Sequence, residues 1–180
     1  MKMGKIKLTK NQKEWLEIAV YIFIGYLIAV GANKGLSFAL HTNFPVIAVV
    51  SGSMEHNNPE TTFYPFMESK SFTMEQIKHL PFSDGMRKGD IVFVQGVPFE
   101  KLKAGDVIVY VVPGKEPIIH RIVEKNSDGL MTKGDNNMAL DQAYGGIAPA
   151  IKPEYVRGKA VLHVPLLGYV KIVYMKITGK

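Results

Sequence analysis

Residues 106–123 read DVIVYVVPGKEPIIHRIV, in which two runs of apolar and mostly β-branched residues flank a short turn. Valine and isoleucine favour β-strands, whereas the proline and glycine between the runs favour a turn. Runs of the same kind lie on both sides of this stretch, at residues 46–50, 90–95, 130–133, 156–164 and 168–177. The sequence therefore predicts a mostly β domain with an antiparallel, barrel-like sheet. It leaves open whether the last run is a strand or an end of the chain that grazes a membrane.

Three glycine–aspartate pairs recur along the chain: Gly89-Asp90, Gly105-Asp106 and Gly134-Asp135. The first two stand directly before predicted strands, where glycine supplies the unusual φ angle of a turn and aspartate caps it. No motif of the type G-x-x-x-x-G-K-[ST] is present. These pairs are therefore interpreted as turns and not as a glycine-rich phosphate loop.

An apolar run, WLEIAVYIFIGYLIAVGA, occupies residues 15–32 and contains a single charge, Glu17. As a helix, these 18 residues would extend about 27 Å, close to the thickness of the hydrocarbon core of a bilayer. A cleaved signal peptide has a shorter apolar region, and a core helix normally keeps a polar face, which residues 18–30 lack. The sequence predicts one transmembrane helix at residues 14–33.

The net charge of +6 is unevenly distributed, because residues 1–13 contain five lysines and no acidic residue. The rest of the chain has 17 basic and 16 acidic residues, so the body shows no basic patch of the kind that binds nucleic acid. Lysines beside an apolar helix favour a cytoplasmic location for that end. We therefore expect a cytoplasmic basic tail at residues 1–13, a single pass through the cell membrane and an extracytoplasmic β-rich domain at residues 34–180.

Residues 55–88 form a long polar stretch without a clear period between two of the predicted strands. Connections of this length without secondary structure are uncommon in compact domains. We interpret the stretch as an insertion or excursion at the edge of the core, with one short helix near residues 74–79.

A metal centre is not expected, because the chain lacks cysteine and its five histidines show no spacing typical of zinc ligands. A nucleophile is the better candidate. Ser51 and Ser53 directly follow the first predicted strand, and a serine hydroxyl needs a base within hydrogen-bond reach. His120 interrupts an apolar strand and is the candidate base, while Asp135 and Asp141 are candidates for a carboxylate that orients it. Taken singly, these residues are also typical of turns, structural histidines and polar loops.

The order of these motifs is more specific than any one of them. A membrane helix is followed by Ser-Gly-Ser-Met, Gly-Asp-Ile-Val, Ile-His-Arg-Ile and Gly-Asp-Asn-Asn, with a further aspartate six residues after the aspartate of the last motif. This order resembles the type I signal peptidases, and most of all their archaeal and endoplasmic-reticulum type, whose base is histidine rather than lysine. The resemblance runs from about residue 15 to about residue 170, outside residues 55–88.

The resemblance implies Ser53 as the nucleophile, His120 as the general base and Asp141 as the triad acid. In bacterial relatives a lysine stands at the position of His120. Asp135 would be a supporting residue, and Ser51 would lie near the oxyanion site.

Two local features bear on this assignment. Asp135 follows a glycine in a tight turn, so its carboxylate is expected to bond the backbone of its own loop. Asp141 follows the apolar residues 138–140, which would direct it at the rim of the core. The family usually has proline at the position of His56, which leaves the path of the turn after Ser53 open.

The resemblance implies a membrane-bound serine endopeptidase that cleaves N-terminal signal peptides from exported preproteins with small residues at positions −1 and −3. No metal or organic cofactor is expected, and the other expected partners are membrane lipid and the protein translocation machinery. A catalytically silent, anchored β-domain that binds or scaffolds an export complex is the alternative from another class. A serine–lysine dyad would need Lys133 or Lys115 to be buried, and both lie in polar, turn-like sequence.

Overall fold

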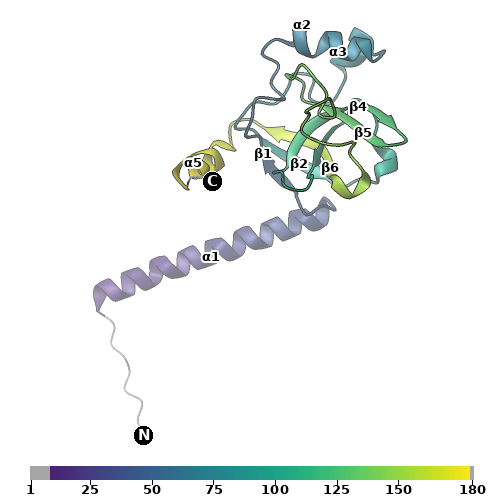
Figure 1. Ribbon diagram of the computed structural model, residues 1–180. Helices are drawn as coiled ribbons and strands as arrows, with labels where there is room; N and C mark the ends of the chain where they lie inside the picture. Colours follow the sequence, from purple (N-terminus) through teal and green to yellow (C-terminus); the bar gives the residue numbers. More distant parts are fainter. Residues whose placement is uncertain (1–8, 179–180) are drawn as a thin grey trace. The chain divides into compact units, whose positions relative to one another are not determined.

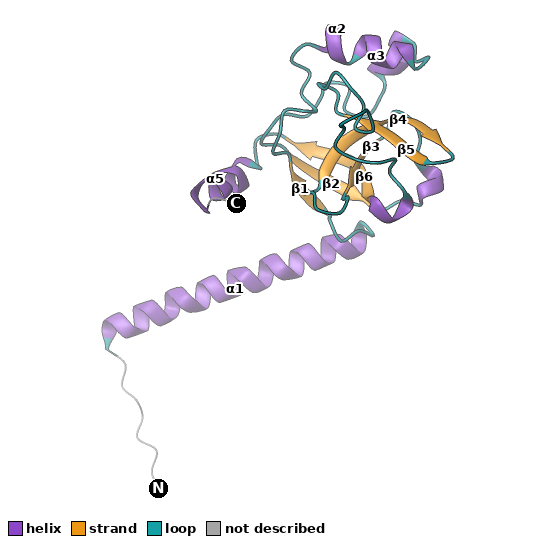
Figure 2. Cartoon of the chain, in the orientation of Figure 1, coloured by secondary structure: helices purple, strands orange, loops and turns teal. Residues whose placement is uncertain are grey.

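The chain forms two compact units, residues 1–39 and 40–180, and the computed structural model describes residues 9–178 (Figure 1). The described part of the first unit is one long helix, and the second unit is a β domain with several short helices (Figure 2). Most of the predicted basic tail, including its first three lysines, lies outside the described residues.

Helix α1 spans Lys10–Ala39, a total of 30 residues, and is longer at both ends than the predicted 14–33. It begins after Thr9, whose hydroxyl accepts a hydrogen bond from the Gln12 amide while the Gln12 side chain accepts one from the Thr9 amide. It ends shortly before His41, which has a φ of +53°. Among the described residues it is the one helix long and apolar enough to cross a membrane, with a mean hydropathy of 1.9.

Six strands make one antiparallel sheet in the order β1-β2-β6-β3-β4-β5, and the sheet curls strongly (Figure 2). The strands are β1 (Val46–Ala48), β2 (Ile91–Gln95), β3 (Val107–Tyr110), β4 (Ile118–Asn126), β5 (Gly129–Lys133) and β6 (Val156–Val164). Two single-turn 3-10 helices precede β3 and β6, at Phe99–Lys101 and Pro153–Tyr155. The predicted mostly β fold is confirmed, and β1 and β5 are the edge strands.

Both faces of β3 and of the first part of β4 are buried, which explains why these two stretches are continuous apolar runs in the sequence. In β3, Val107 and Val109 belong to one cluster, while Ile108 and Tyr110 belong to another. The first cluster also contains Ile47, Val49, Met54, Met86, Val92, Val94, Ile119 and Ala160. The second also contains Leu102, Val112, Ile122, Leu130 and Ile151. Burying one such aliphatic side chain contributes roughly 1.5–3 kcal/mol, so the two clusters supply the main stabilisation of the sheet.

The first two glycine–aspartate pairs form the turns that the sequence predicts. Gly89 and Gly105 have φ angles of +96° and +94°, a region that disfavours residues with a Cβ atom. The Asp90 carboxylate accepts a hydrogen bond from the Arg87 amide at 2.9 Å, and the Asp106 carboxylate makes the equivalent bond in its own turn. Each turn is therefore closed by the aspartate just before β2 or β3 begins.

Residues 55–88 are more closely integrated with the core than the expected excursion. They contain α2 (Pro59–Thr62), α3 (Tyr64–Ser69) and α4 (Met74–Lys78). Helix α4 confirms the short helix predicted near residues 74–79, and a capping box between Thr73 and Gln76 fixes its start. Buried side chains of this segment form a third cluster with β4, made of Phe63, Met67, Ile77 and Val123. No helix is long enough to repeat an apolar period, which is why the sequence pattern hid this part of the core.

Of the two readings that the sequence left open for residues 168–177, the strand is wrong, because Tyr169–Thr178 form helix α5. The chain leaves β6 at Leu166, whose φ is +65°, and the Gly168 amide then donates to the Gly89 carbonyl at 2.7 Å. β6 already pairs with β2 on one edge and β3 on the other, so no free strand edge lies beside it. A helix satisfies the backbone groups of this segment internally.

We expect residues 40–180 to fold without α1, because the sheet and all three clusters lie within this unit. Purified in mild detergent, this fragment should unfold in one cooperative thermal transition, as small single domains usually do. The full-length chain in the same detergent is the control for circular dichroism. A broad, non-cooperative transition of the fragment alone would show that the domain requires α1.

Candidate active site

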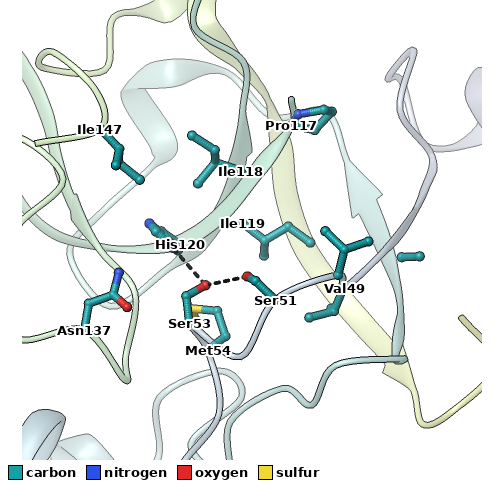
Figure 3. A pocket seen from close by; sticks show the side chains of 12 residues that line it. Val49, Ser51, Ser53, Met54, Pro117, Ile118, Ile119, His120, Asn137 and Ile147 are labelled. Atoms are coloured by element: carbon teal, nitrogen blue, oxygen red, sulfur yellow. Dashed lines mark hydrogen bonds between the residues drawn. The ribbon is translucent and has the colours of Figure 1, made fainter. Parts of the chain in front are cut away.

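Ser53 lies in a tight turn at the rim of the sheet, shortly after β1. The chain stays beside β2 beyond the end of β1, because the Val49 amide donates to the Asp90 carbonyl at 2.8 Å. It then turns at Gly52, whose carbonyl accepts a hydrogen bond from the Glu55 amide at 3.1 Å. The turn leaves Ser53 half-buried and directs its side chain toward the imidazole of β4 (Figure 3).

Ser53, His120 and Asp141 form a continuous hydrogen-bonded series. His120 Nε2 lies 3.0 Å from Ser53 Oγ (Figure 3), and His120 Nδ1 lies 2.6 Å from Asp141 Oδ2. A carboxylate only accepts, so this network assigns the imidazole proton to Nδ1 and leaves Nε2 to accept the serine hydroxyl proton. The structure thus brings together three residues that the sequence singled out, with the imidazole in the tautomer that a general base requires.

Two hydroxyls that the sequence analysis did not single out complete the surroundings of Asp141. Tyr110 Oη donates to Asp141 Oδ2 at 2.8 Å, and Thr132 Oγ1 donates to the same oxygen at 2.7 Å. Burial, reinforced by the Asp141 charge, raises the pKa of Tyr110 above its usual value, so this hydroxyl remains a donor. Both side chains are fully buried. They hold the Asp141 carboxylate in place beside the imidazole. In the sequence, the one feature that distinguishes Tyr110 and Thr132 is a hydroxyl group within a predicted strand.

The Asp135 carboxylate bonds two other side chains, and the expectation that it bonds the backbone of its own loop is wrong. Arg121 Nε donates to Oδ1 at 2.9 Å and Arg121 Nη2 donates to Oδ2 at 2.7 Å. His56 Nε2 donates to the same Oδ2 at 3.0 Å. Burial by itself raises the pKa of Asp135, but the Arg121 charge and the His56 hydrogen bond outweigh it and hold that pKa below its usual range. The Asp135 carboxylate therefore pairs with the buried Arg121 guanidinium instead of capping the backbone of its own turn.

The loop that follows β5 packs directly against Ser53. The Asn136 amide donates to the Ser53 carbonyl at 2.8 Å, and Asn136 Nδ2 donates to the Gly52 carbonyl at 3.1 Å. A Cβ atom on Gly134 would lie 2.7 Å from the Ser53 carbonyl oxygen and 2.9 Å from His120 Nε2. Glycine is required at this position by close approach to the site, and not by a positive φ angle.

The contacts of Lys133 and Lys115 disfavour the serine–lysine alternative. The polar surroundings expected from the sequence are not the reason. Lys133 is buried, contrary to what its sequence surroundings suggest, and burial lowers its pKa to about 8 in spite of the nearby charges of Asp135 and Asp141. Its Nζ donates to three backbone carbonyls. Lys115 is exposed in the turn between β3 and β4. The side chain that offers a base to the Ser53 hydroxyl is that of His120.

Ser53 lines a cleft of about 220 Å³ that lies between the end of β1 and the start of β4 (Figure 3). Ser51 Oγ lies 3.1 Å from Ser53 Oγ, beside the opening. The apolar walls are formed by Ala48, Val49, Val50, Met54, Pro117, Ile118, Ile119 and Ile147, and the other polar lining residues are His120 and Asn137. Sites for small-molecule ligands usually measure about 300–1,000 Å³, so this narrower cleft suits small side chains better than a bulky ligand.

Comparison with known proteins adds an independent observation. No protein-family model matches the chain. The chain is 34% identical over 146 residues to the signal peptidase complex catalytic subunit sec11 of Sclerotinia sclerotiorum, and the match covers 77% of this chain and 69% of the relative. Subunits of the same name from Pyricularia oryzae and Zygosaccharomyces rouxii are 32% and 33% identical over 146 and 147 residues. Those two matches each cover 77% of this chain, and 69% and 71% of the respective relatives.

A serine hydroxyl, an imidazole and a carboxylate linked in this order at the rim of a β-sheet are the groups that peptidases use for acyl transfer. Together with the apolar helix α1, they define a peptidase with one candidate membrane span. The chain belongs to the family of signal peptidase complex catalytic subunits. The resemblance drawn from the order of its motifs is therefore confirmed.

Asp135→Asn should destabilise the domain by about 3–5 kcal/mol, because it leaves the buried Arg121 guanidinium without its counter-charge. Since the pKa of Asp135 is lowered on folding, its stabilising contribution is present above the pKa of the unfolded carboxyl. This contribution is lost as the pH falls through the folded pKa. Urea unfolding of the full chain in detergent, at pH 7 and at decreasing pH, measures both effects.

The matched control is Asp128→Asn, which changes an exposed aspartate in the turn between β4 and β5. This variant should unfold at nearly the wild-type urea concentration, as surface substitutions usually do. Equal stability of the two variants would contradict the role given to the Asp135–Arg121 pair.

Proposed function

We propose that the protein is a membrane-bound serine endopeptidase that removes N-terminal signal peptides from exported preproteins. In this proposal Ser53 is the nucleophile, His120 is the general base and Asp141 is the carboxylate that orients the base. The observation that carries the proposal is the buried hydrogen-bonded series from Asp141 through His120 to a half-buried serine at the mouth of an apolar cleft. Membership of the signal peptidase family supports the choice of substrate.

The geometry supports a two-step acyl transfer. Ser53 Oγ attacks the carbonyl carbon of the scissile bond while His120 Nε2 takes up the hydroxyl proton. The imidazolium stays paired with Asp141 and passes the proton to the leaving amine. The same imidazole then deprotonates a water molecule, which hydrolyses the acyl-enzyme. The backbone N–H of Ser53 and the hydroxyl of Ser51 are the groups proposed to stabilise the oxyanion.

The cleft supports an extended substrate with small residues at positions −1 and −3. Because β1 is an edge strand, a peptide can add to its free edge through main-chain hydrogen bonds. In an extended peptide, side chains two residues apart point to the same side. Those at −1 and −3 would then enter the cleft together, and its volume of about 220 Å³ restricts both to small groups.

We place the catalytic domain on the extracytoplasmic side of the membrane, with α1 crossing once. The support for this orientation is the lysine-rich sequence at the N-terminal end of α1, which favours a cytoplasmic location. Since the relatives are named as subunits of a complex, we expect this chain to act with further subunits. Membrane lipid and the translocation machinery are the other proposed neighbours.

A silent scaffolding domain would retain the anchor and the sheet but would give no reason for the bond from His120 to the Ser53 hydroxyl. It predicts that the chain binds a preprotein and leaves it intact. A peptidase predicts one new pair of termini, which mass measurement of the products locates. This difference makes cleavage of a preprotein by the detergent-solubilised chain the deciding measurement.

Ser53→Ala and His120→Ala should abolish cleavage, because they remove the nucleophile and the base. Asp141→Asn should lower single-turnover cleavage by at least ~10²-fold, since it removes the charge opposite the imidazolium and can favour the wrong tautomer. Thermal melts of each variant show that the fold is retained. Normal cleavage by Asp141→Asn together with an Asp135→Asn that is folded but inactive would reverse the roles of the two carboxylates, and activity in His120→Ala would exclude the proposed base.

A further inference from the structure

We propose that His56 is a positioning residue of the active site, which fastens the turn that carries Ser53 to the loop that carries Asp135. The two segments are called here the nucleophile turn, residues 51–56, and the acid loop, residues 134–137. The inference rests on the proposed function, because it takes Ser53 as the nucleophile. The mechanism above uses neither His56 nor its bond to the acid loop.

The His56 side chain is held in one orientation by its contacts. Its Nε2 donates to Asp135 Oδ2 at 3.0 Å, and the two side chains are only 7% and 2% exposed. Its ring lies against that of Phe63, with centroids 4.4 Å apart. On another side, a Cβ atom added to Gly85 would approach the imidazole to 2.9 Å. A ring enclosed in this way cannot turn aside without breaking the bond to Asp135.

The bond from His56 closes a short ring of contacts around the nucleophile. Two adjacent residues of the acid loop hold two points of the nucleophile turn, three residues apart. The Asn136 amide donates to the Ser53 carbonyl at 2.8 Å, and Asp135 accepts from His56. The turn is therefore held at the reacting residue and at its far end, which fixes its path where the sequence left it open.

The same carboxylate connects the nucleophile turn to the strand that carries the base. Asp135 accepts two hydrogen bonds from Arg121, at 2.9 and 2.7 Å, and Arg121 directly follows His120 in β4. His56 thus completes a path of contacts from the nucleophile to the neighbour of the base. Without this contact the acid loop would still pack on Ser53, and the Met86 amide would still hold the Met54 carbonyl at 2.8 Å, but no bond would tie the end of the turn to the acid loop. A misplacement of about 1 Å at a reacting atom can cost about 10²-fold in rate.

The bond needs a donor at the position of Nε2 and does not depend on a charge. Neutral imidazole with its proton on Nε2 and imidazolium both supply this donor. The side-chain amide of glutamine can supply an N–H at a similar reach, whereas alanine cannot. Glutamine is therefore the conservative replacement that separates the hydrogen bond from the aromatic ring.

The test compares four variants of the full chain in detergent micelles, with a synthetic preprotein peptide as substrate. His56→Ala should lower kcat by about 10- to 100-fold with KM nearly unchanged, because Ser53 is displaced while the cleft walls remain. His56→Gln should recover most of the lost kcat. Phe63→Leu keeps the hydrogen bond and removes the stacked ring, so it should lower the melting temperature more than kcat. His79→Ala, an exposed histidine of the same segment, should behave as wild type.

Wild-type kcat in His56→Ala would overturn the inference. So would a loss in His56→Gln as large as that in His56→Ala. Equal losses of kcat in His56→Ala and Phe63→Leu, in step with their melting temperatures, would make His56 a packing residue only and would also overturn it. Ser53→Ala separates this inference from the proposed function. If Ser53→Ala still cleaves, Ser53 is not the nucleophile and the proposed function fails. If Ser53→Ala is inactive and the wild type is active, the kcat values of the His56 variants test the role of His56 alone.

Discussion

The Arg121 guanidinium is a permanent charge with no exposed surface, and much of the domain is arranged to satisfy it. Removing such a charge from water costs several kcal/mol unless a counter-charge and further acceptors replace the lost hydration. Its N–H groups donate to the Asp135 carboxylate and to the carbonyls of Pro81, Phe82 and Gly105. One side chain thereby joins β4, the turn before β3, the segment of short helices and the loop after β5.

This constraint also gives a physical account of the segment at residues 55–88. A polar stretch without a period has no amphipathic face to bury, but it can enclose a buried ion pair with aromatic rings and carbonyl groups. Phe63 supplies a ring whose centroid lies 5.0 Å from the Arg121 guanidinium carbon, and the same ring packs on His56. Cation–π contacts of this kind gain strength when the cation is desolvated. The segment is therefore a wall of the ion-pair site as well as a cover of the sheet.

Local signals in the sequence were sufficient for the six strands of the sheet, and the order of the motifs singled out Ser53, His120 and Asp141, which the fold brings together. Each strand is marked by its own β-branched residues, and the three polar residues are marked by the order of their motifs. The supports of Asp141 were not predictable, because Tyr110 lies 31 residues away in the chain and nothing beside it distinguishes its hydroxyl.

Two expectations failed because a long-range contact outweighed a local preference. The turn at Asp135 favours a carboxylate that caps its own backbone. Leaving the buried Arg121 guanidinium without a counter-charge would cost more free energy than losing this cap, so the carboxylate pairs with Arg121. The last apolar run favours a strand by composition, but the sheet offers it no edge beside β6. A sequence pattern indicates which secondary structure or turn a segment prefers. It does not indicate which strands or charged groups of the fold are available to pair with that segment.

Strand β4 carries two neighbouring residues with different contacts: His120 lies beside Ser53, and Arg121 pairs with Asp135. His120 and Arg121 are consecutive, so their side chains leave opposite faces of the strand, one toward the serine and the other toward its buried counter-charge. A shift of one residue in the pairing with β3 would exchange them and place beside Ser53 a guanidinium, which cannot accept a proton. The break in register between Ile122 and Glu124 marks where the pairing with β5 absorbs an irregularity beyond this pair. The strand is thus constrained in length as well as in composition, because an insertion or deletion before that break would separate His120 from Ser53 whichever residue it added or removed.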